Sequence, residues 1–160
     1  MSVIEICEAT IDDAALILKF ITELAIYEEA EHEVVATESD IKESLFGEDS
    51  NTKAVICNIN NEPVGFAVYF YNYSTWLGRQ GLYLEDLYVS SKQRGSGAGK
   101  ALLKYLAKIA ISKDCGRFEW SVLDWNEPAI QFYQSIGAKP QEEWVSYRLT
   151  GESLEAFANS

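Results

Sequence analysis

The sequence predicts an α/β protein that forms a single domain over residues 1–160. Three observations lead to this prediction. Apolar runs typical of strands alternate along the chain with runs of helical periodicity. A length of 160 residues suits one domain with a sizeable core. A glycine-rich turn at residues 93–100 joins a strand-like run to a helix-like run. We therefore expect a β-sheet flanked by helices.

The first part of the chain predicts one strand and two helices. Residues 3–9 form a strand-like run. Thr10, with an acidic residue three positions later, begins a helix that ends near Tyr27. Thr37 begins a second helix by the same signal, and Gly47 ends it.

The middle of the chain predicts three strands. Residues 53–59 and 64–71 have the composition of strands, and the Asn-Asn-Glu-Pro turn at residues 60–63 makes them a hairpin. We expect residues 73–81 to form a loop and residues 82–89 to form a further strand.

The last part predicts two helices and two strands. An amphipathic helix spans residues 100–112, and a strand follows at residues 117–123. Asn126 or the next residue caps a helix that stops at Gly137. Residues 144–150 predict the final strand.

The composition favours some partners and excludes others. A net charge of −12 argues against nucleic acid and against anionic membrane surfaces. It is compatible with a small cationic substrate, and the alternative is that the charge serves solubility alone. The 3 cysteines are widely spaced and predict neither a metal site nor a disulfide framework. No apolar run reaches the roughly 18 residues of a membrane span, and no apolar stretch follows a basic start as in a signal peptide. We expect a reduced, cytoplasmic protein.

The glycine turn predicts a phosphate-binding site, because glycines admit close approach and helix N-termini present N–H groups. Two common nucleotide motifs fail on spacing. A Walker A loop needs glycine where Arg94 stands and a hydroxyl residue where Ala101 stands. A dinucleotide-binding loop needs its last glycine where Lys100 or Leu102 stands.

The remaining pattern is Arg-x-x-Gly-x-Gly, formed by Arg94, Gly97 and Gly99. Followed by a helix, and later by a helix that carries Asn126 and Tyr133, it resembles the GNAT superfamily of N-acetyltransferases. In that family the turn binds the pyrophosphate of acetyl-coenzyme A. The resemblance implies a mixed, strongly twisted sheet flanked by helices and splayed where the coenzyme enters. The alternative is a glycine-rich connector without a ligand.

Further segments resemble the diamine acetyltransferases, the spermidine/spermine N1-acetyltransferase group. They are residues 24–28, 84–86, 125–128 and 132–133, while residues 122–126 are closer to the thialysine-type branch. The similarity covers residues 3–150. It implies direct acetyl transfer from acetyl-coenzyme A to a primary amine of a small polyamine, a diamine or an aminoalkyl amino acid. It also implies a homodimer and no metal.

The resemblance implies two catalytic side chains. Glu85 holds the ammonium group and accepts its proton, directly or through water. Asp86 faces the opposite side of the sheet if the strand is regular. Tyr133 donates a proton to the leaving thiolate. A core tyrosine with a bonded hydroxyl is the alternative for Tyr133.

The coenzyme contacts implied by the family combine backbone and side chains. The N–H of Leu87 polarises the thioester carbonyl and Val89 pairs with the pantetheine arm, which requires an irregular strand that leaves these groups free. The complete coenzyme set is Leu87, Tyr88, Val89, Arg94, Gly95, Ser96, Gly97, Ala98, Gly99, Lys100, Asn126 and Tyr133.

The acceptor contacts implied by the family are Tyr27, Glu28, Glu85, Asp86 and Trp76. Ser74 or Thr75 stands where some members carry an acid near Trp76, so the length of the acceptor stays open. Glu142 or Glu143 corresponds to an acid that reaches across a dimer interface.

Two rival functions remain on sequence grounds. The first is a GNAT enzyme for another amine: an amino acid, an aminoglycoside or a protein lysine. The second is a module that binds acetyl-coenzyme A without catalysis. His32, the 1 histidine of the chain, stands in an acidic segment and has no partners for nucleophilic or metal chemistry.

Overall fold

The computed structural model describes residues 2–160 and divides them into two compact units, one up to Ser121 and one from Val122 to Ser160. The first unit contains a mixed sheet covered by helices on both faces, so the α/β prediction is confirmed. The single domain over residues 1–160 stays a prediction.

Five strands form the sheet of the first unit, in the order β1-β2-β3-β4-β5. Neighbouring strands are antiparallel except for β4 and β5, which are parallel. The strands are β1 (Ile4–Glu8), β2 (Thr52–Ile59), β3 (Glu62–Ser74), β4 (Arg79–Val89) and β5 (Phe118–Trp120).

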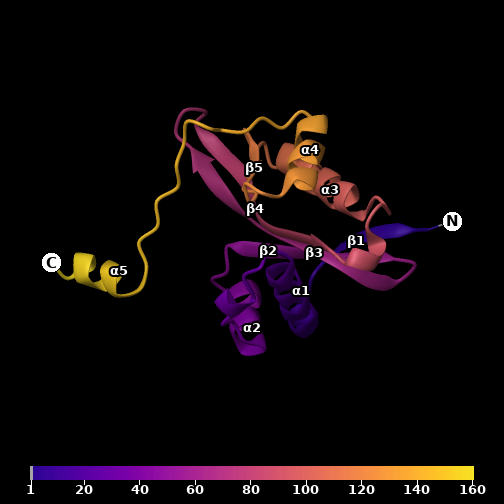
Figure 1. Cartoon of the computed structure of the whole chain (residues 1–160), viewed down its shortest axis with the longest axis horizontal. Coiled ribbons are helices and arrows are strands. Elements are labelled where there is room, and N and C mark those ends of the chain that lie inside the picture. The colour runs from indigo at the N-terminus through magenta and orange to yellow at the C-terminus, as the bar shows by residue number, and fades with distance from the viewer. Residues whose placement is uncertain (1) are drawn as a thin grey trace. The chain divides into compact units, whose positions relative to one another are not determined.

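Two helices cover one face of this sheet (Figure 1): α1 (Ala14–Tyr27), which follows the short 3-10 helix η1 (Ile11–Asp13), and α2 (Glu38–Phe46). A second short helix, η2 (Glu31–Glu33), lies between them in the chain. Their apolar sides bury a core against the middle strands, which accounts for most of the stability of such helices. This core comprises Ala14, Ile17, Phe20, Ile41, Ala54, Ile56, Phe66, Val68 and Tyr88.

Helix α3 (Ala98–Ser112) covers the opposite face (Figure 1) and is preceded by the 3-10 helix η3 (Ser91–Gln93). Its apolar stripe includes Leu102 and Leu106, which are fully buried. The sequence predicted this amphipathic helix, but the helix begins at Ala98 rather than Lys100 because Gly97 takes the N-cap position.

The predicted loop at residues 73–81 is wrong in extent. Strand β3 continues to Ser74 and β4 begins at Arg79, and these two residues pair across the hairpin. The connection is short and contains Gly78 at φ +68°. Residues at both ends of the predicted loop lie within strands, where pairing overrides local propensity.

The second unit contains α4 (Glu127–Ser135) and α5 (Gly151–Ala158). The predicted final strand at residues 144–150 is wrong, because these residues form neither strand nor helix. A strand needs a neighbour for its backbone groups, and no strand is assigned among residues 122–160. The sequence analysis also missed α5.

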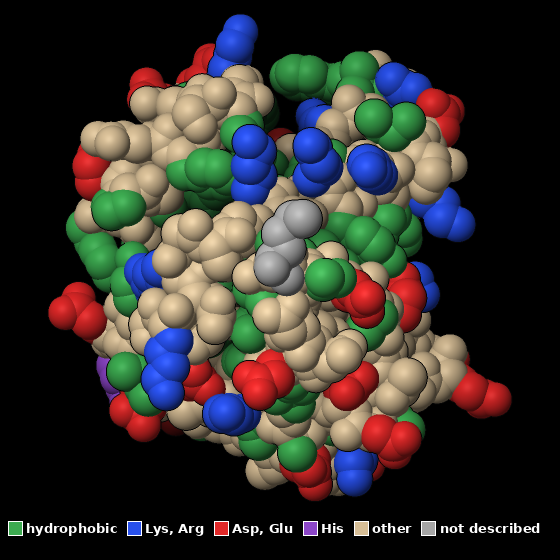
Figure 2. Space-filling model, turned by 90° about the vertical axis from the view of Figure 1, so that its right-hand side faces the viewer, with side chains coloured by type: hydrophobic (Ala, Val, Ile, Leu, Met, Phe, Trp, Pro, Cys, Tyr) green, Lys and Arg blue, Asp and Glu red, His purple; other side chains and the backbone are tan. Residues whose placement is uncertain are grey.

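No helix among residues 2–160 is long and apolar enough to cross a membrane. The net charge of −12 is not evenly distributed. On the face shown in Figure 2, Lys and Arg side chains gather in a row in the upper part, while Asp and Glu side chains predominate lower down. A chain of net negative charge therefore still has a group of positively charged side chains on this face.

Candidate functional site

Strand β4 changes its pairing at Glu85. The N–H of Leu82 donates to the carbonyl of Arg117 on the β5 side (3.0 Å), whereas the N–H of Ser90 donates to Val64 on the β3 side (2.7 Å). These two donors stand an even number of positions apart, so a regular strand would aim them at the same edge. One extra residue must therefore lie between them.

The register of β3 against β4 locates that residue. Val68 pairs with Asp86 and the next residue, Tyr69, pairs with Leu84, so Glu85 is left without a partner. This is a β-bulge, a feature that redirects the groups on either side of it. It is the strand irregularity that the sequence analysis required and could not locate.

The outer edge of β4 is open beyond the bulge. Pairing with β5 ends at Leu84, and no strand among residues 2–121 pairs with that edge after it. Counting back from Ser90, the N–H groups of Val89 and Leu87 point to the open edge, while that of Tyr88 points to β3. Two backbone donors are thus directed toward the place where a ligand strand would add.

The glycine turn directly follows this open edge. Gly95 and Gly97 have φ of +83° and +90°, a conformation that other residues adopt only at a cost. Gly97 forms the N-cap of α3, and the hydroxyl of Ser96 accepts a hydrogen bond from the N–H of Ala98 (3.3 Å). These two glycines are therefore required by the backbone.

The first turn of α3 presents donors to solvent. The N–H of Ala101 bonds back to the carbonyl of Gly97 (2.9 Å), so the earlier N–H groups of Gly99 and Lys100 have no carbonyl one turn behind them. The side chains of Arg94 and Lys100 are exposed at the two ends of the turn. This arrangement fits an anionic group such as a pyrophosphate.

A half-buried carboxyl lies on the face that α1 covers. Asp86 pairs with Val68, a core residue of that face, and directly opposed residues share a face. Burial, together with the negative charges of Glu85 and Glu28, raises the pKa of Asp86 to about 6. Glu85 itself is exposed.

This finding changes the picture of the two acids. The expectation that Glu85 and Asp86 face opposite sides assumed a regular strand, and the bulge removes that assumption. The sequence analysis expected Glu85 to accept the proton, whereas the partly buried side chain of the two is Asp86. Burial also raises the pKa of Glu28, which directly follows α1.

The end of α1 contacts the glycine turn. The Cζ of Arg94 lies 4.6 Å from the centroid of the Tyr27 ring. The hydroxyl of Tyr88 donates to Glu23 of α1 (3.0 Å). Burial and this hydrogen bond raise the pKa of Tyr88, and the positive charge of Arg94 lowers it. No sequence signal predicted these contacts, because their partners are far apart in the chain.

Trp76 lies in the short β3–β4 connection and is 82% exposed. Ser74, by contrast, is buried, and its hydroxyl accepts a hydrogen bond from the N–H of Leu77 (3.1 Å). Ser74 therefore stabilises the turn that carries Trp76.

Two predicted residues belong to the second unit. Asn126 is at the N-cap position of α4, as predicted, and its carbonyl accepts from Ile130 (3.1 Å), but its side chain makes no capping hydrogen bond. Tyr133 lies on α4 and is partly buried, with its ring centroid 6.0 Å from that of Phe132. Glu142 and Glu143 are exposed.

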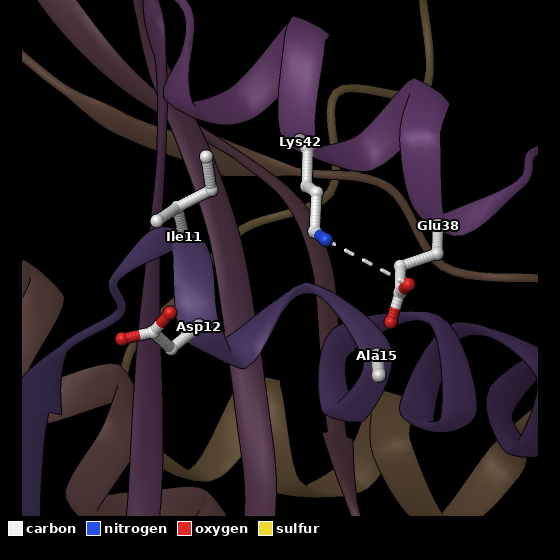
Figure 3. A pocket seen from close by; sticks show the side chains of 5 residues that line it. All are labelled: Ile11, Asp12, Ala15, Glu38 and Lys42. Carbon is white, nitrogen blue, oxygen red and sulfur yellow. Dashed lines mark ion pairs between the residues drawn. The ribbon is translucent and has the colours of Figure 1, made fainter.

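A hollow of about 370 Å³ lies between the start of α1 and α2 (Figure 3). Lys42 and Glu38 of α2 form an ion pair across part of it (3.8 Å), and Asp12 lines the other side. None of its lining residues is a predicted site residue. Among residues 2–160, no cluster of His, Cys, Asp and Glu has the arrangement of a metal site.

Comparison with known proteins gives a consistent result. Residues 20–138 match the model of the Acetyltransferase (GNAT) family. Thialysine N-epsilon-acetyltransferase of Mus musculus is 36% identical over 99% of both chains. Spermidine/spermine N(1)-acetyltransferase-like protein 1 of Homo sapiens is 34% identical over 96% of this chain and 24% of its own. The solved integron cassette protein of V. cholerae superimposes with a TM-score of 0.83, at 32% identity over 98% of both chains.

Proposed function

The chain belongs to the GNAT family of acetyltransferases and is an acetyl-coenzyme A-dependent N-acetyltransferase, and we propose that its acceptor is a small aliphatic amine. The amine is a polyamine, a diamine or an aminoalkyl amino acid. The observation that carries this proposal is the group of acids at the end of α1: Glu28 and Asp86 are both partly buried, and Asp86 is influenced by the charges of Glu28 and Glu85. A substrate with ammonium groups compensates the cost of placing these carboxylates together.

The open edge of β4 and the glycine turn fit the donor substrate. The outward N–H groups of Leu87 and Val89 suit the thioester and the pantetheine arm, and the turn suits the pyrophosphate. The residues proposed to bind coenzyme are Leu87, Tyr88, Val89, Arg94, Gly95, Ser96, Gly97, Ala98, Gly99, Lys100, Asn126 and Tyr133.

The proposed reaction is direct transfer. An alkylamine has a pKa of about 10.4 and must lose a proton before its nitrogen can attack the thioester carbon. Glu85 accepts this proton, directly or through water, and the N–H of Leu87 stabilises the charge that grows on the carbonyl oxygen. After the new C–N bond forms, the C–S bond breaks and Tyr133 gives its phenolic proton to the sulfur. The nitrogen then releases its second proton to solvent, and the phenol regains a proton from solvent. The acceptor is held by Tyr27, Glu28, Asp86 and Trp76, and no metal takes part.

We also propose that both units form one domain over residues 1–160. The family match supports this, because residues 20–138 extend across the boundary at Ser121. A homodimer in the cytoplasm is proposed from the resemblance to diamine acetyltransferases, with Glu142 or Glu143 serving the partner's acceptor site.

A panel of amines tests the proposal. Spermidine, putrescine, thialysine and lysine are each assayed with acetyl-coenzyme A, and we expect acetylation of at least one. Tyr133→Phe should lower kcat by about 100-fold or more while the Kd of coenzyme A stays near its original value. Acetylation of none of the four amines would favour another class of amine. Unchanged kcat in Tyr133→Phe would remove Tyr133 as the acid.

A further inference from the structure

Arg94 joins the two halves of the proposed site. It begins the glycine turn, while Tyr27 is the last residue of α1, and the guanidinium carbon lies 4.6 Å from the centre of the tyrosine ring. In the proposed function Arg94 binds the donor and Tyr27 contacts the acceptor. The two substrate sites therefore share a direct contact within the first unit.

The geometry of arginine allows it to make both contacts at once. Its guanidinium group is planar, so its face can stack on an aromatic ring while its edge presents N–H donors to a phosphate. An exposed arginine otherwise samples many rotamers, and each must be given up when a ligand binds. Stacking on Tyr27 restricts Arg94 before any phosphate arrives.

The charges around Arg94 support a defined position. Its positive charge lowers the pKa of Tyr88, whose hydroxyl is bonded to Glu23 of α1. The charge of Arg94 therefore acts on Tyr88 of β4, while its guanidinium lies over the Tyr27 ring of α1, although its side chain is exposed.

We propose that Tyr27 positions Arg94 for the phosphates of the coenzyme, so that a residue of the acceptor side contributes to donor affinity. This inference rests on the proposed function, because it takes Arg94 as a phosphate ligand and Tyr27 as an acceptor contact. If the amine changes how Tyr27 holds Arg94, bound amine and bound coenzyme change each other's affinity by the same factor. A cation–π contact at an exposed site corresponds to a factor of about 2–5.

A double-mutant cycle on the Kd of coenzyme A, measured by calorimetry without any amine, tests the positioning. Tyr27→Leu should raise this Kd about 2–5-fold, because the ring that restrains Arg94 is lost. In an Arg94→Gln background the same substitution should have no effect. Tyr27→Phe, which keeps the ring, should bind coenzyme A like the unaltered chain.

Lys100→Gln is the matched control. It removes a positive charge from the same turn without removing the stacked pair, so Tyr27→Leu should still raise the Kd about 2–5-fold in that background. An equal effect of Tyr27→Leu in the Arg94→Gln background would overturn the positioning role. Failure of the unaltered chain to bind coenzyme A would instead overturn the proposed function.

A second measurement uses substitutions that should leave the fold intact. Fluorinated phenylalanines at position 27 preserve the shape of the ring and progressively weaken its attraction for a cation. We expect the Kd of coenzyme A to rise with each added fluorine. A Kd independent of fluorination would contradict the proposal even if Tyr27→Leu proved unstable.

Discussion

The two halves of β4 differ in whether their outer edge is paired with the following chain. In the first half, residues 79–84, the outer edge is bonded to the following chain: Gln80 accepts from Gly116 (2.9 Å) and Leu82 donates to Arg117 (3.0 Å). In the second half, residues 85–89, the outer edge has no partner strand among residues 2–121. We call these the paired half and the open half.

The difference arises from two local features. Strand β5 ends at Trp120, so its pairing stops at Leu84, and Glu85 adds one residue to β4. Without the bulge, the N–H groups of Leu87 and Val89 would point to β3. The comparison teaches that one extra residue in a strand turns the following N–H groups away from the neighbouring strand and toward an open edge.

The largest expected effect separates the two halves directly. Replacing the amide N–H of Leu87 by an ester oxygen should lower kcat by about 100- to 1,000-fold, because the carbonyl oxygen loses its donor in the transition state. Steady-state kinetics with acetyl-coenzyme A measures this effect.

The control is the same replacement at Leu82 in the paired half. It removes the hydrogen bond to Arg117 and should cost about 1 kcal/mol in the free energy of unfolding, with little change in kcat. Equal kinetic effects at both positions would show that the halves do not differ in function.

Sequence reasoning predicted the paired elements better than the open half. Local signals located the α2 cap at Thr37 and the Arg94-x-x-Gly97-x-Gly99 turn, because caps and positive φ depend on neighbouring residues. The bulge at Glu85 depends on the register against β3, which no local pattern encodes. The contact of Tyr27 with Arg94 depends on the whole fold. The strand predicted at residues 144–150 is wrong for the same reason, since pairing is not a local property.

The second prediction concerns how much the partly buried carboxylate of Asp86, in the open half, lowers the free energy of unfolding. The pKa of Asp86 is raised to about 6 in the folded chain from an ordinary 3.8. The folded state therefore binds the proton more tightly, and the stability that protonation contributes is present below about pH 4 and lost as the pH rises through 6. Asp86→Asn should relieve this loss.

Denaturant unfolding at pH 4 and pH 8 measures the relief. From pH 4 to pH 8, the free energy of unfolding of Asp86→Asn should rise by up to about 3 kcal/mol relative to that of the unaltered chain. Glu31→Gln, at an exposed acid of η2, is the control and should change stability by less than about 0.5 kcal/mol. A gain that does not depend on pH would contradict the burial of an ionised Asp86.

The third prediction uses the same carboxyl in binding. Spermidine keeps its charge between pH 5 and 7, so a pH dependence of its Kd reports on the protein. With coenzyme A bound, the Kd should rise up to about tenfold from pH 7 to pH 5, because protonation removes the charge of Asp86. Asp86→Asn should bind weakly and with a smaller dependence on pH, which then reports on Glu28, whose pKa is also raised by burial.

Glu85→Gln sharpens this test. The charge of Glu85 raises the pKa of Asp86, so its removal should move the rise in Kd to lower pH. An unshifted profile would show that Asp86 does not control the binding of the amine.

The smallest effect is expected far from both halves. The hydroxyl of Thr37 accepts from the N–H of Asp40 (3.1 Å) at the start of α2, and Thr37→Ala removes that bond. It should cost about 1 kcal/mol and lower Tm by about 2–4 °C, while Thr37→Ser retains the cap and the stability. Because α2 stabilises the core through Ile41 and has no part in the open edge, the Kd of coenzyme A should not change. A higher Kd of coenzyme A in Thr37→Ala would mean that binding at the open half depends on the stability of the whole unit. The two halves of β4 would then differ in geometry but would not be energetically independent.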